Sequence, residues 1–114
     1  MPRRHTLPSD EALYLIASYF AALSDPMRLK LVRTLMAGEQ NVNTLVDSTG
    51  GVQSNVSRHL AKLTSSGLLH RRKEGAHVIY SIADDSIYDL CSQVCGILEK
   101  RLAKQARIVG IPHR

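Results

Sequence analysis

The sequence has little aromatic character: tryptophan is absent, and one phenylalanine and four tyrosines occur in 114 residues. So few rings argue against an aromatic stacking platform for single-stranded nucleic acid and against a barrel around a ligand cavity. The longest apolar runs are only a few residues, so we expect no membrane-spanning helix. No apolar segment follows the first residues as it would in a secretory signal. We therefore expect a cytoplasmic protein without a membrane partner.

Cysteine is also scarce, with only Cys91 and Cys95. Two thiols are too few for a disulfide scaffold, and they fit a reduced pair in the cytoplasm. The hydrophobic share of 44% is ordinary and argues against disorder. At this length we expect one small domain that spans residues 1–114, with flexible ends at 1–8 and 108–114.

Acidic residues are fewer than basic ones, 10 against 15, which gives a formal net charge of +5. The excess is unevenly distributed along the chain. Residues 48–82 hold five basic side chains and one acidic side chain, whereas residues 83–95 hold three aspartates and no basic side chain. A basic middle segment followed by an acidic one favours a polyanion as the first partner to test.

The hydrophobic period changes along the chain and predicts the element order H-H-H-H-E-E-H. The first helix is expected over residues 10–23. Asp25 is a good N-cap and Pro26 suits the first position of the second helix, which we expect to run to about residue 37. Leu29, Val32 and Leu35 are the side chains expected to point inward from it.

Glycines and short polar residues delimit the next elements. Asn43 is expected to cap a short third helix that ends at Gly50-Gly51, and a fourth helix follows from about Gln53 to Gly67. Residues 68–73 and 77–82 alternate as two strands of a hairpin. The last helix is expected from Asp84, a residue suited to a helix start.

The third and fourth helices with their glycine turn form a candidate helix-turn-helix motif. Its second helix is rich in short polar side chains, and the hairpin that follows is basic and would form a wing against the DNA backbone or the minor groove. Glutamine and asparagine can bind adenine in the major groove, and arginine can bind guanine or phosphate. The residues expected to contact double-stranded DNA are Gln53, Ser54, Asn55, Ser57, Arg58, His59 and Lys62 of the helix and Arg71, Arg72, Lys73 and His77 of the hairpin.

Three ordered segments of this chain resemble the ArsR/SmtB family of winged-helix bacterial repressors. They are Ala21-Ala22-Leu23-Ser24-Asp25-Pro26-Met27-Arg28-Leu29-Lys30-Leu31, Gln53-Ser54-Asn55-Val56-Ser57-Arg58-His59-Leu60-Ala61-Lys62-Leu63, and Ser66-Gly67-Leu68-Leu69 leading into the hairpin. The resemblance covers nearly the whole length. It implies a winged helix-turn-helix fold, a homodimer formed by the first and last helices, a symmetric operator, and repression relieved by an inducer. Val52 stands where the family often has a capping Ser or Thr, and we expect it to take an apolar role.

Two inducer sites of the family do not transfer to this chain. The cysteine cluster near the third helix has no counterpart, because residues 39–46 contain no cysteine. The Asp/His site of the last helix also fails, because Ser86 stands where a histidine is expected after Asp84.

Cys91 and Cys95 remain as the candidate inducer ligands, one helical turn apart on the last helix. Soft thiolates suit As(III), Sb(III) or an organoarsenical, and no cofactor is expected to be obligatory. Three thiols per metalloid would need a ligand from a partner chain or from elsewhere, whereas two can hold a methylated arsenical. Two other interpretations stay open: a redox or sulfane-sulfur sensor that uses the same thiols, and cysteines that only pack.

Other function classes fit less well. A dithiol enzyme is disfavoured because the chain has no C-x-x-C pair and no catalytic triad or paired-carboxylate constellation. A nonspecific architectural DNA-binding protein remains an alternative, which competition with random DNA would separate from a repressor.

Overall fold

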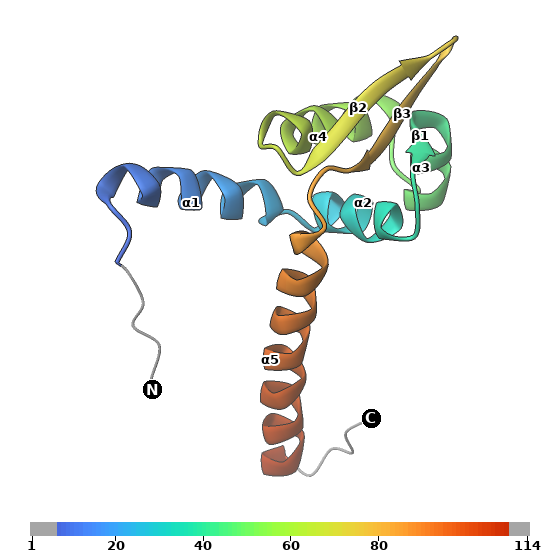
Figure 1. Cartoon of the computed structure of the whole chain (residues 1–114). Helices are drawn as coiled ribbons and strands as arrows, with labels where there is room; N and C mark the ends of the chain where they lie inside the picture. The colour runs from blue at the N-terminus through green and yellow to red at the C-terminus, as the bar shows by residue number, and fades with distance from the viewer. Residues whose placement is uncertain (1–6, 110–114) are drawn as a thin grey trace. The chain divides into compact units, whose positions relative to one another are not determined.

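A computed structural model describes residues 7–109 of the chain (Figure 1). The flexible ends expected at 1–8 and 108–114 therefore lie largely outside the described residues. Residues up to Ala83 and residues from Asp84 onward form two compact units. The elements, in chain order, are α1 (Asp10–Leu23), α2 (Pro26–Met36), β1 (Gln40–Asn41), α3 (Val42–Thr49), α4 (Gln53–Ser65), β2 (Leu69–Glu74), β3 (His77–Ile82) and α5 (Ser86–Val109).

The mainly helical order with a β-hairpin is as the sequence predicts, with one strand added. β1 pairs antiparallel with β3, Gln40 opposite Tyr80 and Asn41 opposite Ile79, so the sheet has the order β1-β3-β2. This strand corrects the expected start of the third helix. The side chain of Asn41, not Asn43, caps α3 by accepting a hydrogen bond of 2.8 Å from the amide of Thr44.

The core of the first unit lies between α2, α3, α4 and the base of the hairpin. Val56, Leu60 and Leu63 are buried on one face of α4, as their spacing predicts. On α2 the prediction was partly wrong: Val32 and Leu35 are buried, but Leu31 is buried in place of Leu29, which is 45% exposed. The apolar face of α4 fixes which side of this helix remains on the surface.

Two glycines make the turn between α3 and α4, for different reasons. Gly50 ends α3 in the left-handed region with φ 71°, where residues with a Cβ are strained. Gly51 is instead required by space, because a Cβ there would lie 2.7 Å from Cγ2 of Val56 and 3.3 Å from Cε of Met27. Since Val56 is fully buried, it cannot move away without disturbing the core.

Gly51→Ala is therefore expected to lower the free energy of unfolding by about 1–3 kcal/mol, the usual cost of overpacking a core. Urea unfolding followed by circular dichroism measures this change. A variant as stable as the wild type would contradict the close packing of Gly51 on α4.

Candidate nucleic-acid interface

The outward face of α4 is polar and basic. Ser54, Arg58 and Lys62 recur at a spacing of four residues and are all exposed, opposite the buried face of the helix. Gln53 is also exposed at the first turn, and Ser57 is half-buried on the flank. The expected DNA-facing residues of α4 are thus divided: Ser54, Arg58 and Lys62 form one exposed stripe, and Gln53 is exposed beside it at the first turn.

The N-terminal end of α4 has no side-chain cap. Val52 occupies the N-cap position without a capping hydrogen bond. Its side chain is 70% exposed, so the expectation that it takes an apolar role was wrong. Backbone amides of an uncapped first turn can donate to phosphate oxygens, because they have no partner inside the helix.

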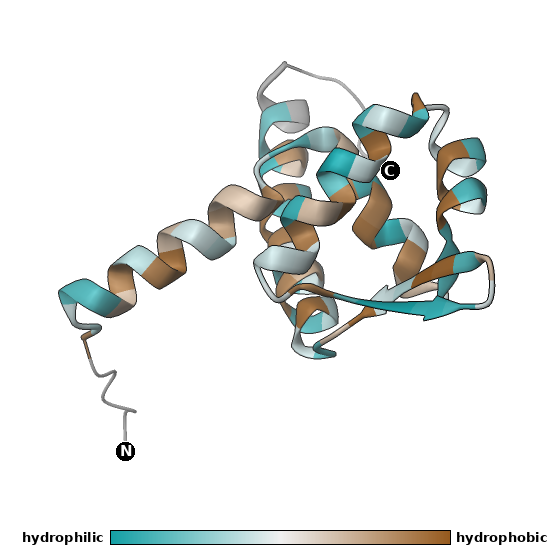
Figure 2. Cartoon of the chain, turned by 90° about the horizontal axis from the view of Figure 1, so that it is seen from above, coloured by the Kyte–Doolittle hydropathy of each residue, from teal (hydrophilic) through white to brown (hydrophobic). Residues whose placement is uncertain are grey.

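The hairpin presents its basic residues on two opposite faces. Arg71 lies opposite Tyr80 and Lys73 opposite Val78, so both share the face of the sheet that includes the buried Tyr80. Arg72 lies opposite Ile79, on the other face, and His77 lies opposite Glu74. Figure 2 shows the hydrophilic character of β2 along its length. Arg71, Lys73 and His77 are exposed.

Arg72 is held by two carboxylates. Its guanidinium donates to both oxygens of Glu39, at 2.6 and 2.8 Å, and to Glu74 at 2.9 Å. The hydrogen bond from Arg72 lowers the pKa of Glu39, and the same carboxylates raise the pKa of Arg72 above its ordinary value. The structure therefore assigns Arg72 a partner within the protein, and we do not retain it among the DNA contacts.

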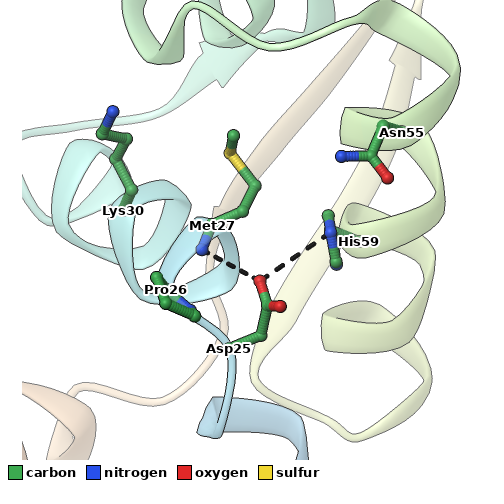
Figure 3. Close-up of a pocket in the computed structure, with 6 residues that line it drawn as sticks. All are labelled: Asp25, Pro26, Met27, Lys30, Asn55 and His59. Atoms are coloured by element: carbon green, nitrogen blue, oxygen red, sulfur yellow. Dashed lines mark hydrogen bonds and ion pairs between the residues drawn. The ribbon is translucent and has the colours of Figure 1, made fainter.

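His59 and Asn55 lie on the flank of α4 that faces the start of α2 (Figure 3). They line an open pocket of about 410 Å³ together with Asp25, Pro26, Met27 and Lys30. The side chain of His59 is only 11% exposed, and its Nε2 lies 3.8 Å from Oδ2 of Asp25. The Oδ1 of Asn55 accepts a hydrogen bond from Arg58. Because of this inward position, we also leave His59 out of the DNA-facing set.

Asp25 is the N-cap of α2, as the sequence predicts. Its Oδ2 accepts hydrogen bonds from the amides of Met27, at 2.9 Å, and Arg28, at 3.1 Å. The amide of Arg28 is the main cause of the lowered pKa of Asp25, and the neighbouring His59 adds to it. Asp84 has a lowered pKa for a similar reason, the hydrogen bond from the amide of Ser86 at the start of α5.

A carboxylate with a lowered pKa stabilises the fold at pH values above its ordinary pKa, and this contribution is lost as the pH falls through the lowered value. We therefore expect unfolding free energy to decrease on acidification below about pH 4. In Asp25→Asn the decrease should be smaller, because the titrating group is gone. Urea unfolding between pH 7 and pH 2.5 measures both curves, and parallel curves would contradict the role of Asp25.

Cys91 and Cys95 both lie on α5, four residues apart. Cys91 is half-buried and Cys95 is exposed. Burial, with a smaller contribution from Cys95, raises the pKa of the Cys91 thiol. Within residues 7–109 no cluster of three or more His, Cys, Asp or Glu side chains could hold a metal ion. Among the same residues, no helix is long and apolar enough to cross a membrane.

Comparison with known proteins places this geometry in a family. Residues 25–71 match the model of a family described as bacterial regulatory protein, arsR family. The uncharacterised helix-turn-helix transcriptional regulator Rv0081 of Mycobacterium tuberculosis is 31% identical over 87% of this chain and 89% of its own length. A probable mercury resistance operon repressor of Streptomyces lividans is 38% identical over 65% of this chain and 59% of its own length. The chain thus spans less than two thirds of that repressor.

Solved structures agree with the fold. The crystal structure of Rv0081 matches with a TM-score of 0.79 at 28% identity, over 86% of this chain and 99% of that one. The solution structure of a homodimeric winged helix-turn-helix DNA-binding domain from Mycobacterium bovis matches with a TM-score of 0.76 at 28% identity, over 88% of this chain and 95% of that one. These relatives are regulators of transcription and not enzymes, as the sequence predicts. The chain belongs to the ArsR/SmtB family and is a DNA-binding transcriptional regulator with a winged helix-turn-helix fold.

Proposed function

We propose that the exposed stripe of α4 binds base edges in the major groove of a specific operator, while Arg71, Lys73 and His77 of the hairpin contact the DNA backbone. The observation that supports this most is the alignment of Ser54, Arg58 and Lys62 on the face opposite the core. A helix docked by its exposed polar face can reach base edges with short side chains. Arg71 and Lys73 share one face of the sheet, His77 lies on the other, and none of the three forms a salt bridge within the described residues.

The protein is proposed to act as a homodimer. The exposed apolar side chains of α1 include Leu13, Ile16 and Phe20, each more than 40% exposed in the single chain. On α5, Val94, Leu98 and Leu102 are exposed in the same way. Apolar stripes of this kind are typical of an interface, and the similar domain from Mycobacterium bovis is homodimeric. The dimer implies a two-fold symmetric operator, with half-sites about one DNA turn apart.

The proposed inducer is a thiophilic species that bridges Cys91 and Cys95, such as trivalent arsenic, trivalent antimony or an organoarsenical. Thiols one helical turn apart can hold two coordination positions of a soft ion. The Streptomyces lividans relative is named for resistance to mercury, which is also thiophilic. A species that needs three thiols requires a further ligand from a partner chain, so a methylated arsenical suits the pair in one chain best.

Redox or sulfane-sulfur sensing is the second candidate. Sensors of that kind use thiols with a low pKa, because the thiolate is the nucleophile. Burial raises the pKa of Cys91, and because the thiolate is the reactive form in both candidates, this shift does not separate them.

Two experiments test the proposed function. Selection of bound duplexes from a random library should enrich a two-fold symmetric sequence, and enrichment of no sequence would indicate an architectural protein. The complex with the selected duplex is then titrated with As(III), Sb(III), methylarsenite, Hg(II), Cd(II) and a persulfide donor while fluorescence anisotropy reports DNA release. Release by the persulfide donor alone would support the redox candidate instead.

A further inference from the structure

Three helices of the first unit meet at the side chain of Arg28. Its Nε and Nη2 donate to the backbone carbonyls of Ala22, at 2.6 Å, and Ala21, at 3.1 Å, at the C-terminal end of α1. Its Nη1 lies 3.1 Å from Nδ1 of His59 on α4. One guanidinium on α2 therefore joins the end of α1 to α4.

The tautomer of a neutral His59 ring follows from this contact. A guanidinium only donates hydrogen bonds, so Nδ1 must accept and the proton of a neutral ring lies on Nε2. Nε2 is directed toward the carboxylate of Asp25, at 3.8 Å (Figure 3). Asp25 is itself fixed by the two amides at the start of α2. Asp25, Arg28 and His59 thus form a polar clasp between α1, α2 and α4.

The clasp lies beside the exposed stripe and not on it. His59 is on the flank of α4 with an 11% exposed side chain, one residue beyond the exposed Arg58. The apolar face of α4 fixes its depth against the core, but apolar contacts are not directional. The hydrogen bond from Arg28 to His59 restricts the rotation of the helix about its axis more narrowly, because a hydrogen bond requires a defined geometry.

We propose that Arg28 and His59 are positioning residues for DNA recognition: the clasp holds α4 in the rotation that presents its stripe to the bases, and it links this rotation to the end of α1. The inference rests on the proposal that α4 binds base edges. A direct DNA contact by His59, which the sequence suggested, would lower affinity in the same variants, so the experiment must separate the two roles.

Charge-conserving variants on one helix provide this separation. Arg28→Lys keeps the charge but cannot form the forked contacts, and Arg33→Lys makes the same change at an exposed position of α2 that is outside the clasp. We expect Arg28→Lys to weaken binding to the selected duplex by about tenfold and to leave binding to random duplex within about twofold, whereas Arg33→Lys changes neither. Equal weakening on both duplexes would overturn the positioning role, since that is the result of losing a phosphate contact.

Variants of His59 test the other end of the hydrogen bond from Arg28. His59→Asn keeps an acceptor near the position of Nδ1 and should retain affinity within about threefold, whereas His59→Leu removes the acceptor and should lose about tenfold. In the double variant Arg28→Lys, His59→Leu the losses should not add, because both changes break one connection. Additive losses, or full specific binding by folded His59→Leu, would overturn the proposal. If His59→Leu does not fold, the comparison of Arg28→Lys with Arg33→Lys decides alone.

Failure of the clasp is distinguishable from failure of the proposed function. If the wild-type chain selects no specific duplex, the proposed recognition by α4 is wrong. If it selects one and the clasp variants bind that duplex as the wild type does, only the clasp inference is wrong. Circular dichroism and sedimentation of each variant establish that fold and oligomeric state are unchanged.

Discussion

The double variant Cys91→Ser, Cys95→Ser is expected to bind the selected duplex with wild-type affinity and to lose its response to the inducer entirely. Both residues lie on α5, outside the helix-turn-helix and the hairpin, so the DNA-facing residues are untouched. Serine preserves size but is not a soft ligand, so a thiophilic ion loses both of its protein ligands. In the titration, release should require at least about 100-fold more inducer than for the wild type, a difference of about 2.7 kcal/mol in the free energy of inducer binding.

The single variants and a neighbouring control make this prediction specific. Each single cysteine variant should lose most of the response, because a methylated arsenical needs two thiols. Ser92→Ala, at an exposed position between the cysteines, should respond as the wild type does. Mass spectrometry of the intact chain should show one adduct that blocks both thiols. Release of DNA from the double variant at wild-type inducer concentrations would mean that the two cysteines only pack within the protein.

Arg58→Ala and Lys73→Ala are expected to weaken DNA binding in two different ways. Arg58 lies on the exposed stripe of α4, so its loss should weaken binding to the selected duplex by about 10–100-fold and reduce discrimination against other sequences. Lys73 lies on the wing, so its loss should weaken binding to all duplexes alike and reduce the salt slope by about one.

Affinities for selected and random duplexes over a range of salt concentrations measure both effects. Arg33→Ala removes one positive charge from an exposed position of α2 and serves as the control for net charge. Identical losses for Arg58→Ala and Lys73→Ala on both duplexes would mean that α4 contacts only the backbone, which contradicts recognition by its stripe.

The elements that the sequence predicts well are those with local signals. The first helix has its expected bounds of 10–23, and Asp25 with Pro26 starts α2 as expected, because a cap and an adjacent proline act within one turn. The inward face of α4 likewise follows from its own period. These features depend on residues that are neighbours in the chain.

The features that sequence reasoning missed depend on distant partners. β1 has only two residues and exists because it pairs with β3, about 40 positions later. This pairing gives Asn41 the extended backbone that an N-cap needs, which is why Asn41 and not Asn43 starts α3. No local pattern distinguishes the two asparagines.

The same limit applies to the candidate site. Arg72 is paired with Glu39, 33 residues earlier in the chain, and no pattern in the hairpin itself indicates this partner. His59 turns toward Asp25 because α2 packs beside α4. Spacing on α4 alone shows that His59 is on the flank, but only the tertiary fold identifies the partner that holds it there.

The most direct test of recognition by α4 is the ratio of two affinities of the full chain at one salt concentration, for the selected duplex and for a scrambled duplex of equal length. A sequence-specific repressor should prefer the selected duplex by about a thousandfold or more. Addition of the inducer should reduce this ratio in the wild type and not in Cys91→Ser, Cys95→Ser. A ratio near one in the absence of inducer would contradict sequence-specific recognition by the stripe of α4.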